Sequence, residues 1–364
     1  MAGLSCGIVG LPNVGKSTLF NALTSNRAEA SNYPFCTIDP NVGIVEVPDD
    51  RLEALSEISK SKKSVYAAME FVDIAGLVQG ASNGEGLGNK FLANIRETDA
   101  IIHIVRCFDD PDVVHVAGKV DPIQDIEVIK LELILADLQM TENIIAKLEK
   151  QARVKRELLP TLAVMGRVKE HLDSNQPLSS LSLTDEEEEE VKRYSFLTSK
   201  KVLYVPNVDE SDLPEMDNEY VRQVREYAKR EGNSVVPICA QLEQEIAQLD
   251  FEDRKDFLES LGLREPGLHR LIKESFFLLE LITYITTGEV ETRAWTISKG
   301  DSAVEAAGKI HSDIQKGFIR AEVVDYENML KYCGRVGARE HGKARSEGKD
   351  YIVKDGDIIL FYHN

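Results

Sequence analysis

The chain has 364 residues, of which 43% are hydrophobic and 29% charged, and its 62 acidic residues against 43 basic ones leave a net charge of −19. This length and composition predict a soluble globular protein of two or three domains. The acidic excess argues against a protein that coats nucleic acid with its whole surface, because phosphate would repel the average surface. A local basic face can still bind a phosphate backbone.

The five cysteines are widely scattered and none belongs to a C-x-x-C pair, so the sequence indicates neither a disulfide framework nor a zinc site. The first residues lack the basic and apolar regions of a secretion signal. No stretch reaches the ~18 uninterrupted apolar residues of a membrane span. These features predict a cytoplasmic protein with no membrane partner.

A strand, a glycine-rich turn and a helix open the chain. Residues 4–9 are mostly apolar, residues 10–17 read G-L-P-N-V-G-K-S, and residues 17–23 are apolar at helical spacing. This full match to G-x-x-x-x-G-K-[ST], between a strand and a helix, predicts a phosphate-binding loop. Its backbone N–H groups would face the phosphates, Lys16 would neutralise the β- and γ-phosphoryl oxygens, and the Ser17 hydroxyl would bind Mg²⁺.

Two later segments fit the metal ion and the γ-phosphate. Residues 73–76 read D-I-A-G directly after an apolar strand, so Asp73 is predicted to hold Mg²⁺ through water and the Gly76 N–H to reach the γ-phosphate. Residues 33–37 read Y-P-F-C-T and offer Thr37 as a further ligand for Mg²⁺. Without the phosphate-binding loop, both segments would be ordinary turns.

Further strands at residues 100–105, 201–205 and 234–238, with helices between them, predict an α/β fold built on a doubly wound, mainly parallel sheet. Residues 126–199 interrupt this order with apolar side chains at three-, four- and seven-residue steps, which predict a coiled-coil-like helix and a returning arm. The residues of this seam are Val128, Leu131, Leu135, Leu138, Ile145 and Leu148, with Leu158, Leu162, Met165 and Leu172 on the returning arm. The acidic run at 184–190 predicts the start of a helix, capped by Thr184 and Glu187.

The pattern changes again after residue 279. Strands are predicted at 293–297 and 319–324, around a helix whose apolar face carries Val304, Ala307, Ile310 and Ile314. Residues 351–361 form two apolar runs around an Asp-Gly turn. We therefore expect a separate α+β module at 279–364, after a nucleotide-binding domain at 1–278 that is interrupted by the helical insertion.

The loop that would read the base departs from that of GTPases. GTPases carry N-K-x-D, whose last carboxylate binds the N1–H and 2-amino groups of guanine, whereas residues 207–210 here read N-V-D-E. Asn207 keeps its place, Val208 replaces the lysine, and Glu210 takes the place of the carboxylate. Polar readout of this kind is worth roughly 10⁴-fold in discrimination, so its loss favours ATP. A weakened loop that still reads guanine is the alternative.

These motifs, together with R-C-F at 106–108 and the end segment at 351–357, closely resemble the Obg-like ATPases, the YchF branch of the Obg-related P-loop proteins, along the whole chain. The resemblance implies a P-loop domain of the translation-factor class, a coiled-coil helical domain and a C-terminal TGS domain of ubiquitin-like β-grasp fold. It also implies that ATP is preferred over GTP and that the protein associates with ribosomes.

The predicted site has three sets of residues. Those expected to contact the nucleotide are Asn13, Val14, Gly15, Lys16, Ser17, Thr18, Asn207, Val208 and Glu210. Ser17, Thr37 and Asp73 are expected at the metal ion, and Lys16, Gly76 and His115 are the candidate catalytic residues.

Hydrolysis is expected to be slow. Ras-type proteins place a glutamine after D-x-x-G to orient the attacking water, and Leu77 at that position cannot hydrogen-bond a water. A monovalent cation such as K⁺ near Asn13, or the imidazole of His115, is the candidate for the missing group. A lone histidine is more often structural, and His103, inside an apolar strand, is expected in the core.

Two windows, 147–171 and 331–354, each carry seven Lys or Arg residues against three acids. Such faces can bind the phosphates of rRNA, although basic residues on a helical hairpin are also ordinary solvated surface. The leading hypothesis is a slow, Mg²⁺-dependent ATPase that acts as a nucleotide switch and binds ribosomes. A guanine-specific GTPase with an unusual base loop, and an adaptor that binds nucleotide without hydrolysing it, are the alternatives.

Overall fold

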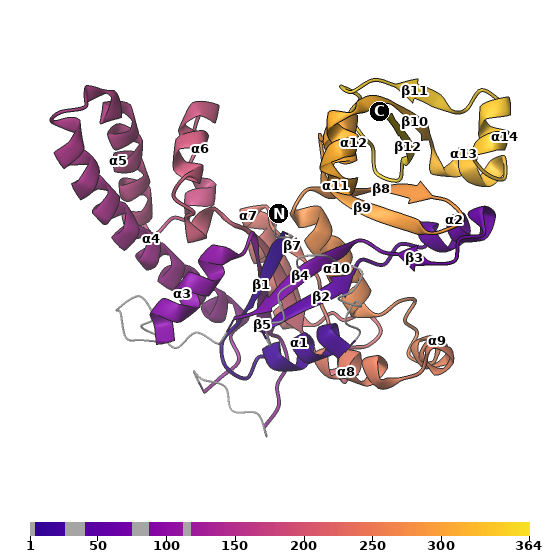
Figure 1. Ribbon diagram of the computed structural model, residues 1–364. Coiled ribbons are helices and arrows are strands. Elements are labelled where there is room, and N and C mark those ends of the chain that lie inside the picture. Colours follow the sequence, from indigo (N-terminus) through magenta and orange to yellow (C-terminus); the bar gives the residue numbers. More distant parts are fainter. Residues whose placement is uncertain (1–3, 26–40, 75–86, 112–117) are drawn as a thin grey trace.

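The computed structural model describes residues 4–25, 41–74, 87–111 and 118–364, which form three parts (Figure 1). An α/β body lies at the centre of the view, with a helical insertion on one side of it and an α+β module on the other. Both additions are connected to the body through helices or strands that pack on it.

The central sheet has six strands in the order β2-β4-β1-β5-β6-β7. All neighbours are parallel except β2 and β4. The strands are β1 (Ser5–Val9), β2 (Val42–Glu46), β4 (Ala68–Asp73), β5 (Ala100–Arg106), β6 (Lys201–Asn207) and β7 (Ser234–Val235). This confirms the predicted doubly wound, mainly parallel sheet, although β7 is shorter than expected. The strand order reverses at β1, which is where open α/β sheets bind their ligands.

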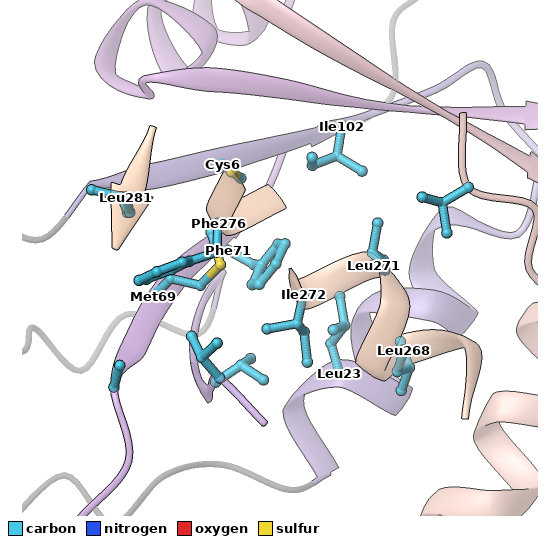
Figure 2. Close-up of a cluster of buried hydrophobic side chains, with 14 of the residues drawn as sticks. Cys6, Leu23, Met69, Phe71, Ile102, Leu268, Leu271, Ile272, Phe276 and Leu281 are labelled. Carbon is cyan, nitrogen blue, oxygen red and sulfur yellow. The ribbon is translucent and has the colours of Figure 1, made fainter. Parts of the chain in front are cut away.

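Alternate residues of the strands enter cores on the two faces of the sheet. Helices α1 (Lys16–Ser25) and α10 (Gly267–Leu278) cover one face. Figure 2 shows Phe71 and Ile102 of the sheet packed against Leu23, Leu271 and Ile272 of these helices. The other face is covered by α3 (Leu87–Glu97), the first half of α4 (Pro122–Ala152) and α7 (Glu219–Glu231). Helices α8 (Ala240–Gln248) and α9 (Phe251–Ser260) lie between β7 and α10 in the chain.

The helical insertion leaves the sheet after β5 and returns at β6. It consists of α4, α5 (Leu159–Asp173) and α6 (Asp185–Lys192), with 3₁₀ turns η3 (Arg156–Leu158), η4 (Leu178–Ser180) and η5 (Leu197–Ser199). Helix α4 begins with a proline after Asp121, whose side chain accepts a hydrogen bond from the Gln124 N–H. The acidic run starts α6, and the predicted capping box of Thr184 and Glu187 is confirmed.

The predicted seam of α4 is only partly right. Leu148 packs with Met165 and Leu172 of α5 as expected, but Leu131 and Leu135 are 43% and 40% exposed. The reason is length, because α5 has 15 residues against 31 in α4 and pairs with the second half of α4. The first half instead packs on the sheet through a different set of side chains, namely Ile126, Ile129 and Leu133.

Asp137 fixes the insertion where α4 leaves the sheet. Its carboxylate is fully buried and accepts hydrogen bonds from the Leu197 N–H at 3.0 Å, and from the N–H and hydroxyl of Thr198 at 2.7 Å each. Burial raises the pKa of this carboxyl, against the lowering effect of the three hydrogen bonds. The first N–H groups of η5 are therefore paired with a side chain of α4.

The C-terminal module contains a second six-stranded sheet in the order β11-β10-β12-β8-β9-β3. Its own strands are β8 (Leu281–Thr287), β9 (Thr292–Ser298), β10 (Phe318–Val324), β11 (Arg345–Glu347) and β12 (Ile358–His363). Its helices are α11 (Ala303–Ile310), α12 (Ser312–Lys316), α13 (Tyr326–Lys331) and α14 (Arg335–Glu340). The hairpin β8–β9 lies beside β12, which runs parallel to β8.

One detail of this module differs from the expectation, and another adds to it. The predicted single helix is two, because the chain turns at His311, which is extended and caps α12. The first of the two apolar runs near the C-terminus is not a strand, since Ile352 is 52% exposed and makes only an isolated bridge with Ser302. The turn at Gly356 is present and uses a left-handed φ of 79°.

One strand of the C-terminal sheet comes from the N-terminal part of the chain. Strand β3 (Ser64–Val65) pairs in parallel with β9, and α2 (Arg51–Ser59) packs against β8, β9 and α13. Arg51 donates hydrogen bonds to Asp49 at 2.8 Å, to Asp355 at 2.8 Å and to the Thr283 hydroxyl at 3.0 Å. The excursion between β2 and β4 is thus built into the module, which is less separate than the sequence suggested.

In the part of the chain that the structure describes, no helix is long and apolar enough to cross a membrane. The cysteines of the same part, Cys6, Cys107, Cys239 and Cys333, are free thiols.

Candidate nucleotide-binding site

The glycine-rich loop joins the end of β1 to the start of α1, beside the middle of the sheet. A Cβ added to Gly10 would lie 2.8 Å from a methyl group of Val14 and 2.9 Å from the Ile104 carbonyl oxygen. Asn13 and Gly15 have left-handed φ angles of 63° and 94°. Asparagine and glycine are the residues that adopt this conformation most readily. The loop is therefore tightly turned and needs these residue types.

Helix α1 begins directly after the loop. Its first hydrogen bond joins the Leu19 N–H to the Gly15 carbonyl oxygen at 3.0 Å. The N–H groups of the preceding residues Lys16, Ser17 and Thr18 therefore have no acceptor within the helix. Such a helix start favours an anion such as a phosphate.

Lys16 and Asp73, which the sequence assigned to phosphate and to metal, are in direct contact. Their side chains form an ion pair and are 11% and 21% exposed. The contact arises because β4 lies beside β1, with Asp73 opposite Ile8. Phosphate would compete for the lysine and a metal ion for the carboxylate, so binding would exchange this ion pair for contacts to the ligand.

The oxygen donors at this point fit Mg²⁺. The Ser17 side chain is exposed on the first turn of α1, and Asp73 ends the neighbouring strand. Mg²⁺ prefers hard oxygen ligands, and in phosphate-binding sites it takes only one or two from the protein and the others from phosphate and water. A hydroxyl and a carboxylate beside a phosphate-binding loop match this donor set.

Asn207 connects the loop to the region that would read the base. It ends β6, is 5% exposed, and donates from Nδ2 to the Val14 carbonyl oxygen at 2.9 Å. Its Oδ1 accepts from the Ala240 N–H at 2.9 Å, and a Cβ on Gly15 would collide with its amide. In this structure the Asn207 amide thus holds the phosphate-binding loop against the start of α8. The sequence did not predict that the Ala240 N–H would bind Asn207. The one feature of the sequence that could have indicated it is that Ala240 follows a predicted strand.

The remaining residues of the base loop differ in their exposure. Val208 is 2% exposed in the core beside α7, and its N–H donates to the Ile238 carbonyl oxygen at 2.9 Å. Asp209 accepts hydrogen bonds from the N–H and hydroxyl of Ser211 at 3.0 and 2.7 Å, and these bonds lower its pKa. Glu210 is exposed at the start of η6 (Glu210–Asp212). Of these three side chains, only the Glu210 carboxylate faces solvent without a role in the local fold.

Several sequence predictions lie outside the described residues. They concern Thr37 as a metal ligand, Gly76 at the γ-phosphate, Leu77 in place of the glutamine, and His115 as a water-orienting group. These stay predictions. His103, by contrast, is confirmed as a core residue, since it is 4% exposed and burial lowers its pKa to about 4.

Arg106, from the R-C-F segment, shapes the loop after β5. It is 1% exposed, donates to the carbonyl oxygens of Phe108 at 3.1 Å and Asp110 at 3.3 Å, and its guanidinium lies 4.6 Å from the centre of the Phe108 ring. These contacts give the residue a structural role.

Comparison with known proteins places the chain in a family. A family model described as "50S ribosome-binding GTPase" (MMR_HSR1) matches residues 5–148, and one named YchF-GTPase_C, described as a protein of unknown function (DUF933), matches residues 281–364. The chain is 55% identical over 363 residues to "Ribosome-binding ATPase YchF" of Bacillus subtilis, covering 99% of both proteins. It is also 55% identical over 363 residues to the protein of that name from Haemophilus influenzae, covering 100% of this chain and 99% of the relative.

A solved structure agrees with these relatives. The structure titled as the Schizosaccharomyces pombe YchF GTPase superimposes with a TM-score of 0.88 at 35% identity, covering 100% of this chain and 98% of that one. The agreement includes the helical insertion and the C-terminal module, because nearly the full length of both chains is aligned. With the phosphate-binding loop, the fold and the full-length relatives in accord, the chain belongs to the YchF family of P-loop proteins.

Proposed function

We propose that this protein is a Mg²⁺-dependent ATPase that hydrolyses ATP to ADP and phosphate and acts as a nucleotide switch on ribosomes. The observation that carries the proposal is the contact of Lys16 with Asp73 at the phosphate-binding loop, which puts a phosphate ligand and a metal ligand at one point. The relatives named ribosome-binding ATPases support both the reaction and the partner.

Each part of the site has a role in this reaction. The loop from Asn13 to Thr18 binds the phosphates through N–H groups, with Lys16 stabilising the charge that develops on the γ-phosphoryl oxygens. Ser17, Asp73 and Thr37 would hold Mg²⁺, and the Gly76 N–H would reach the γ-phosphate. Leu77 cannot orient the attacking water. K⁺ near Asn13, or the imidazole of His115, would take over this role.

The proposed preference for ATP depends on the base loop. A guanine clamp needs a carboxylate held at a fixed place, yet Asp209 is committed to capping η6 and Glu210 is exposed at the end of a longer side chain. Val208, in the place of the GTPase lysine, lies in the core beneath. The names of the relatives divide between ATPase and GTPase, so the preference for adenine is inferred from these residues of the base loop.

The two basic windows differ in how available their charges are. At the hairpin tip, five cations of the 147–171 window are exposed, and within the described residues none of the five forms an ion pair. They are Lys147, Lys150, Arg153, Lys155 and Arg156. In the 331–354 window, Arg339 pairs with Glu322 and Arg345 with Asp325, both at 2.9 Å or less. Its exposed cations without an ion pair within the described residues are four lysines spread over 24 residues, namely Lys331, Lys343, Lys349 and Lys354, whereas the five of the hairpin tip lie within ten residues. We propose that the hairpin tip is the main contact to ribosomal phosphate. Ribosome binding would imply a cytoplasmic location.

Single-turnover hydrolysis of ATP by the full chain tests the reaction. With Mg²⁺ we expect slow release of phosphate that ribosomes accelerate, and with a chelator we expect none. Lys16→Met should abolish turnover, and it should also lower the free energy of unfolding by about 1–3 kcal/mol, because it leaves the mostly buried Asp73 carboxylate without its cation. Release of phosphate from neither the free protein nor the ribosome-bound protein would favour the non-hydrolysing adaptor.

A further inference from the structure

A cavity of about 350 Å³ lies on the face of the central sheet that α1 does not cover. Its floor is formed by two cross-strand pairs of β5 and β6, Ile101 with Val202 and His103 with Tyr204. Its walls come from the first half of α4, the end of α7, and the turns η4 and η5 of the insertion. No residue of the phosphate-binding loop lines this cavity. Its size lies within the range of about 300–1,000 Å³ that is usual for small-molecule sites.

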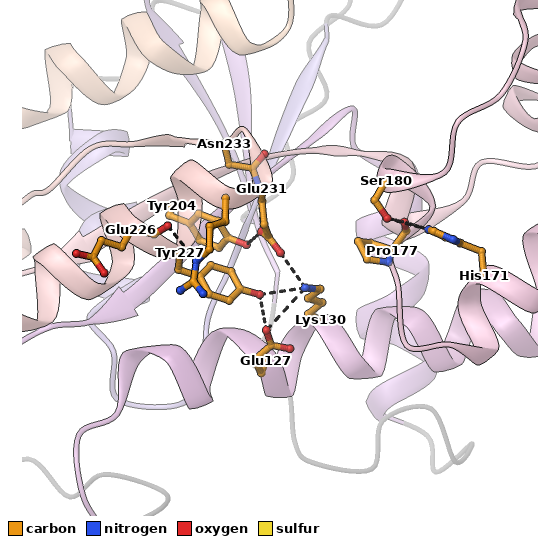
Figure 3. Close-up of polar contacts among 11 residues, drawn as sticks. Glu127, Lys130, His171, Pro177, Ser180, Tyr204, Glu226, Tyr227, Glu231 and Asn233 are labelled. Carbon is orange, nitrogen blue, oxygen red and sulfur yellow. Dashed lines mark hydrogen bonds and ion pairs between the residues drawn. The ribbon is translucent and has the colours of Figure 1, made fainter.

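The acidic group beside the cavity is already fully paired. Figure 3 shows that Glu231 accepts hydrogen bonds from Lys130 and from the Tyr204 hydroxyl, both at 2.8 Å. The Tyr227 hydroxyl donates to Glu127 at 2.5 Å and accepts from Lys130 at 3.0 Å. Burial acts to raise the pKa of Glu231, but the bonds from Lys130 and Tyr204 outweigh it and the pKa is lowered. This carboxylate is therefore not open to a cationic ligand.

The charges around the cavity favour an anion. Four cations line it, Lys130, Lys200, Lys201 and Arg230, of which Lys130 is paired with Glu231 at 2.8 Å and Lys201 with Glu280 at 3.0 Å. Within the described residues, Lys200 donates only to neutral acceptors, the carbonyl oxygens of Arg96 and Thr98, and burial lowers its pKa. Arg230 is exposed at the rim, on the last turn of α7. Within the described residues, Lys200 and Arg230 are thus the two lining cations that no carboxylate neutralises, and they can attract an anion.

His103 gives the floor a polar group without a partner. Its side chain is 4% exposed, lines the cavity, and has no hydrogen bond to any described residue; its ring centre lies 5.6 Å from that of Tyr204. Burial lowers its pKa to about 4, so the imidazole is neutral near pH 7 and offers one donor and one acceptor. Buried polar groups are nearly always paired, so an unpaired imidazole facing a cavity points to a ligand atom or a water at that place.

We propose that this cavity is a second ligand site, which takes a small aromatic carboxylate with its ring on the His103 floor and its anionic group at the Arg230 rim. The apolar side chains Ile101, Ile129 and Leu133 would contact the ring. Because the walls come from both the insertion and the α/β body, a bound ligand would hold these two parts together. The proposal is independent of the ATPase reaction, since it uses none of the residues of the nucleotide site.

A calorimetric titration of the full chain with 4-iodobenzoate tests the site. We expect one equivalent to bind with a dissociation constant of about 1 mM, as befits a ligand of this size. A crystal soaked in the same compound should show the anomalous signal of iodine between β5, β6 and α4. Saturating ATP and Mg²⁺ should leave the affinity unchanged, because the two sites are distinct.

Two neighbouring residues of α7 provide a matched comparison. Arg230→Glu should weaken binding by about fivefold or more, because it reverses a charge at the rim. Lys229→Glu makes the same change one residue away, at an exposed position that does not line the cavity, and should alter the affinity by less than about twofold. Both side chains are exposed, so both variants should fold.

A third variant examines the floor. His103→Phe keeps an aromatic ring but removes both nitrogens, and it should weaken binding severalfold while circular dichroism shows an intact fold. The proposal is overturned if iodine appears at the phosphate-binding loop, if ATP displaces the probe, if Arg230→Glu and Lys229→Glu have equal effects, or if no binding occurs at about 10 mM probe.

Discussion

At the scale of single residues, the nucleotide site depends on two kinds of side chain. Some would bind the ligand, and others hydrogen-bond neighbouring parts of the chain and hold the phosphate-binding loop in place. Asn207 is the main example, because its amide pairs with the Val14 carbonyl oxygen and the Ala240 N–H. Both partners belong to buried residues. Removing the amide would leave two buried backbone groups without hydrogen bonds, and it would release the loop from the base region.

Asn207→Ala should therefore lower both stability and nucleotide affinity. We expect a loss of about 2–4 kcal/mol in the free energy of unfolding, since each unpaired buried group costs about 1–3 kcal/mol. Urea denaturation measures this loss, and a nucleotide titration should show ATP binding weakened by about tenfold or more. Asn21→Ala, at an exposed position on α1, should stay within about 0.5 kcal/mol. Equal stability of the two variants would contradict the role given to Asn207.

His103 gives a prediction of pH dependence. The pKa of a histidine in the unfolded chain is near 6.5, whereas burial lowers that of His103 to about 4. Between these values the unfolded chain binds a proton that the folded chain does not, so the stability present above pH 6.5 is lost as pH falls. We expect wild type to lose about 2 kcal/mol relative to His103→Phe between pH 7.5 and 5.

Urea denaturation of both proteins at the two pH values tests this expectation. His363→Phe is the control, because this residue is exposed beside the C-terminus and should show no such difference. Parallel pH profiles for wild type and His103→Phe would mean that His103 is not buried in its neutral form.

The sequence allowed Lys16, Ser17 and Asp73 to be predicted because each belongs to a motif whose spacing is set by phosphate and metal chemistry. The pairing of Asn207 was not predictable in this way. Its partner Val14 lies 193 residues away in the chain and its partner Ala240 lies 33 residues away, and no local pattern shows that they meet. The fully buried Asp137 is a similar case, since its acceptor role depends on η5, which is 60 residues further on.

At the scale of elements, the spacing of apolar residues in the sequence identified the helices but not the elements that they pack against. The steps of three, four and seven residues in α4 are real, yet Leu131 and Leu135 are exposed because α5 is too short to cover them. The excursion of α2 and β3 into the C-terminal sheet was missed for another reason. Strand β3 has two residues, too few for any alternation to be read, and its pairing with β9 joins segments more than two hundred residues apart.

Arg51 should hold this excursion in place. Its guanidinium bonds Asp49, Asp355 and the Thr283 hydroxyl at 2.8–3.0 Å, and its side chain is 26% exposed. Arg51→Met should cost about 1–3 kcal/mol, because it leaves Asp355 and Asp49 without their cation in a partly buried setting. The free energy of unfolding in urea measures this cost.

Hydrogen exchange locates the effect of the same variant. The Thr292 N–H donates to the Lys63 carbonyl oxygen at 2.9 Å where β3 meets β9, and its exchange should become faster in Arg51→Met. Lys62→Met changes an exposed cation in the same connection and should leave exchange and stability nearly unchanged. Unaltered protection of Thr292 in Arg51→Met would show that the strand pairing alone holds the module.

At the scale of the whole molecule, charge is separated more sharply than the composition suggests. A chain of net charge −19 carries five exposed cations without ion pairs, among its described residues, at the far end of the α4–α5 hairpin. The equally basic 331–354 window is partly neutralised by Glu322, Asp325 and Asp357. Counting charges in the sequence could not separate these two windows, because these three neutralising carboxylates all lie outside the second one.

The difference between the two basic windows can be tested by measuring ribosome binding after cations of the hairpin tip are replaced with neutral residues. Replacing Lys150, Arg153 and Lys155 with glutamine should weaken cosedimentation with ribosomes and reduce the slope of log K against log salt by about 2–3. Replacing Lys331, Lys343 and Lys349, which are three of the four exposed lysines of the second window, changes the net charge equally and should have a smaller effect. A larger effect of the second set would move the proposed contact to the C-terminal module.

The central claim is that the phosphate-binding loop and its altered base loop bind ATP in preference to GTP. Displacement of a fluorescent ATP analogue from the full chain by ATP and by GTP, both with saturating Mg²⁺, measures this preference directly. We expect ATP to compete about tenfold or more tightly than GTP, and Lys16→Met to weaken the binding of both. Equal or tighter competition by GTP would contradict the central claim and would make the protein a GTPase with an unusual base loop.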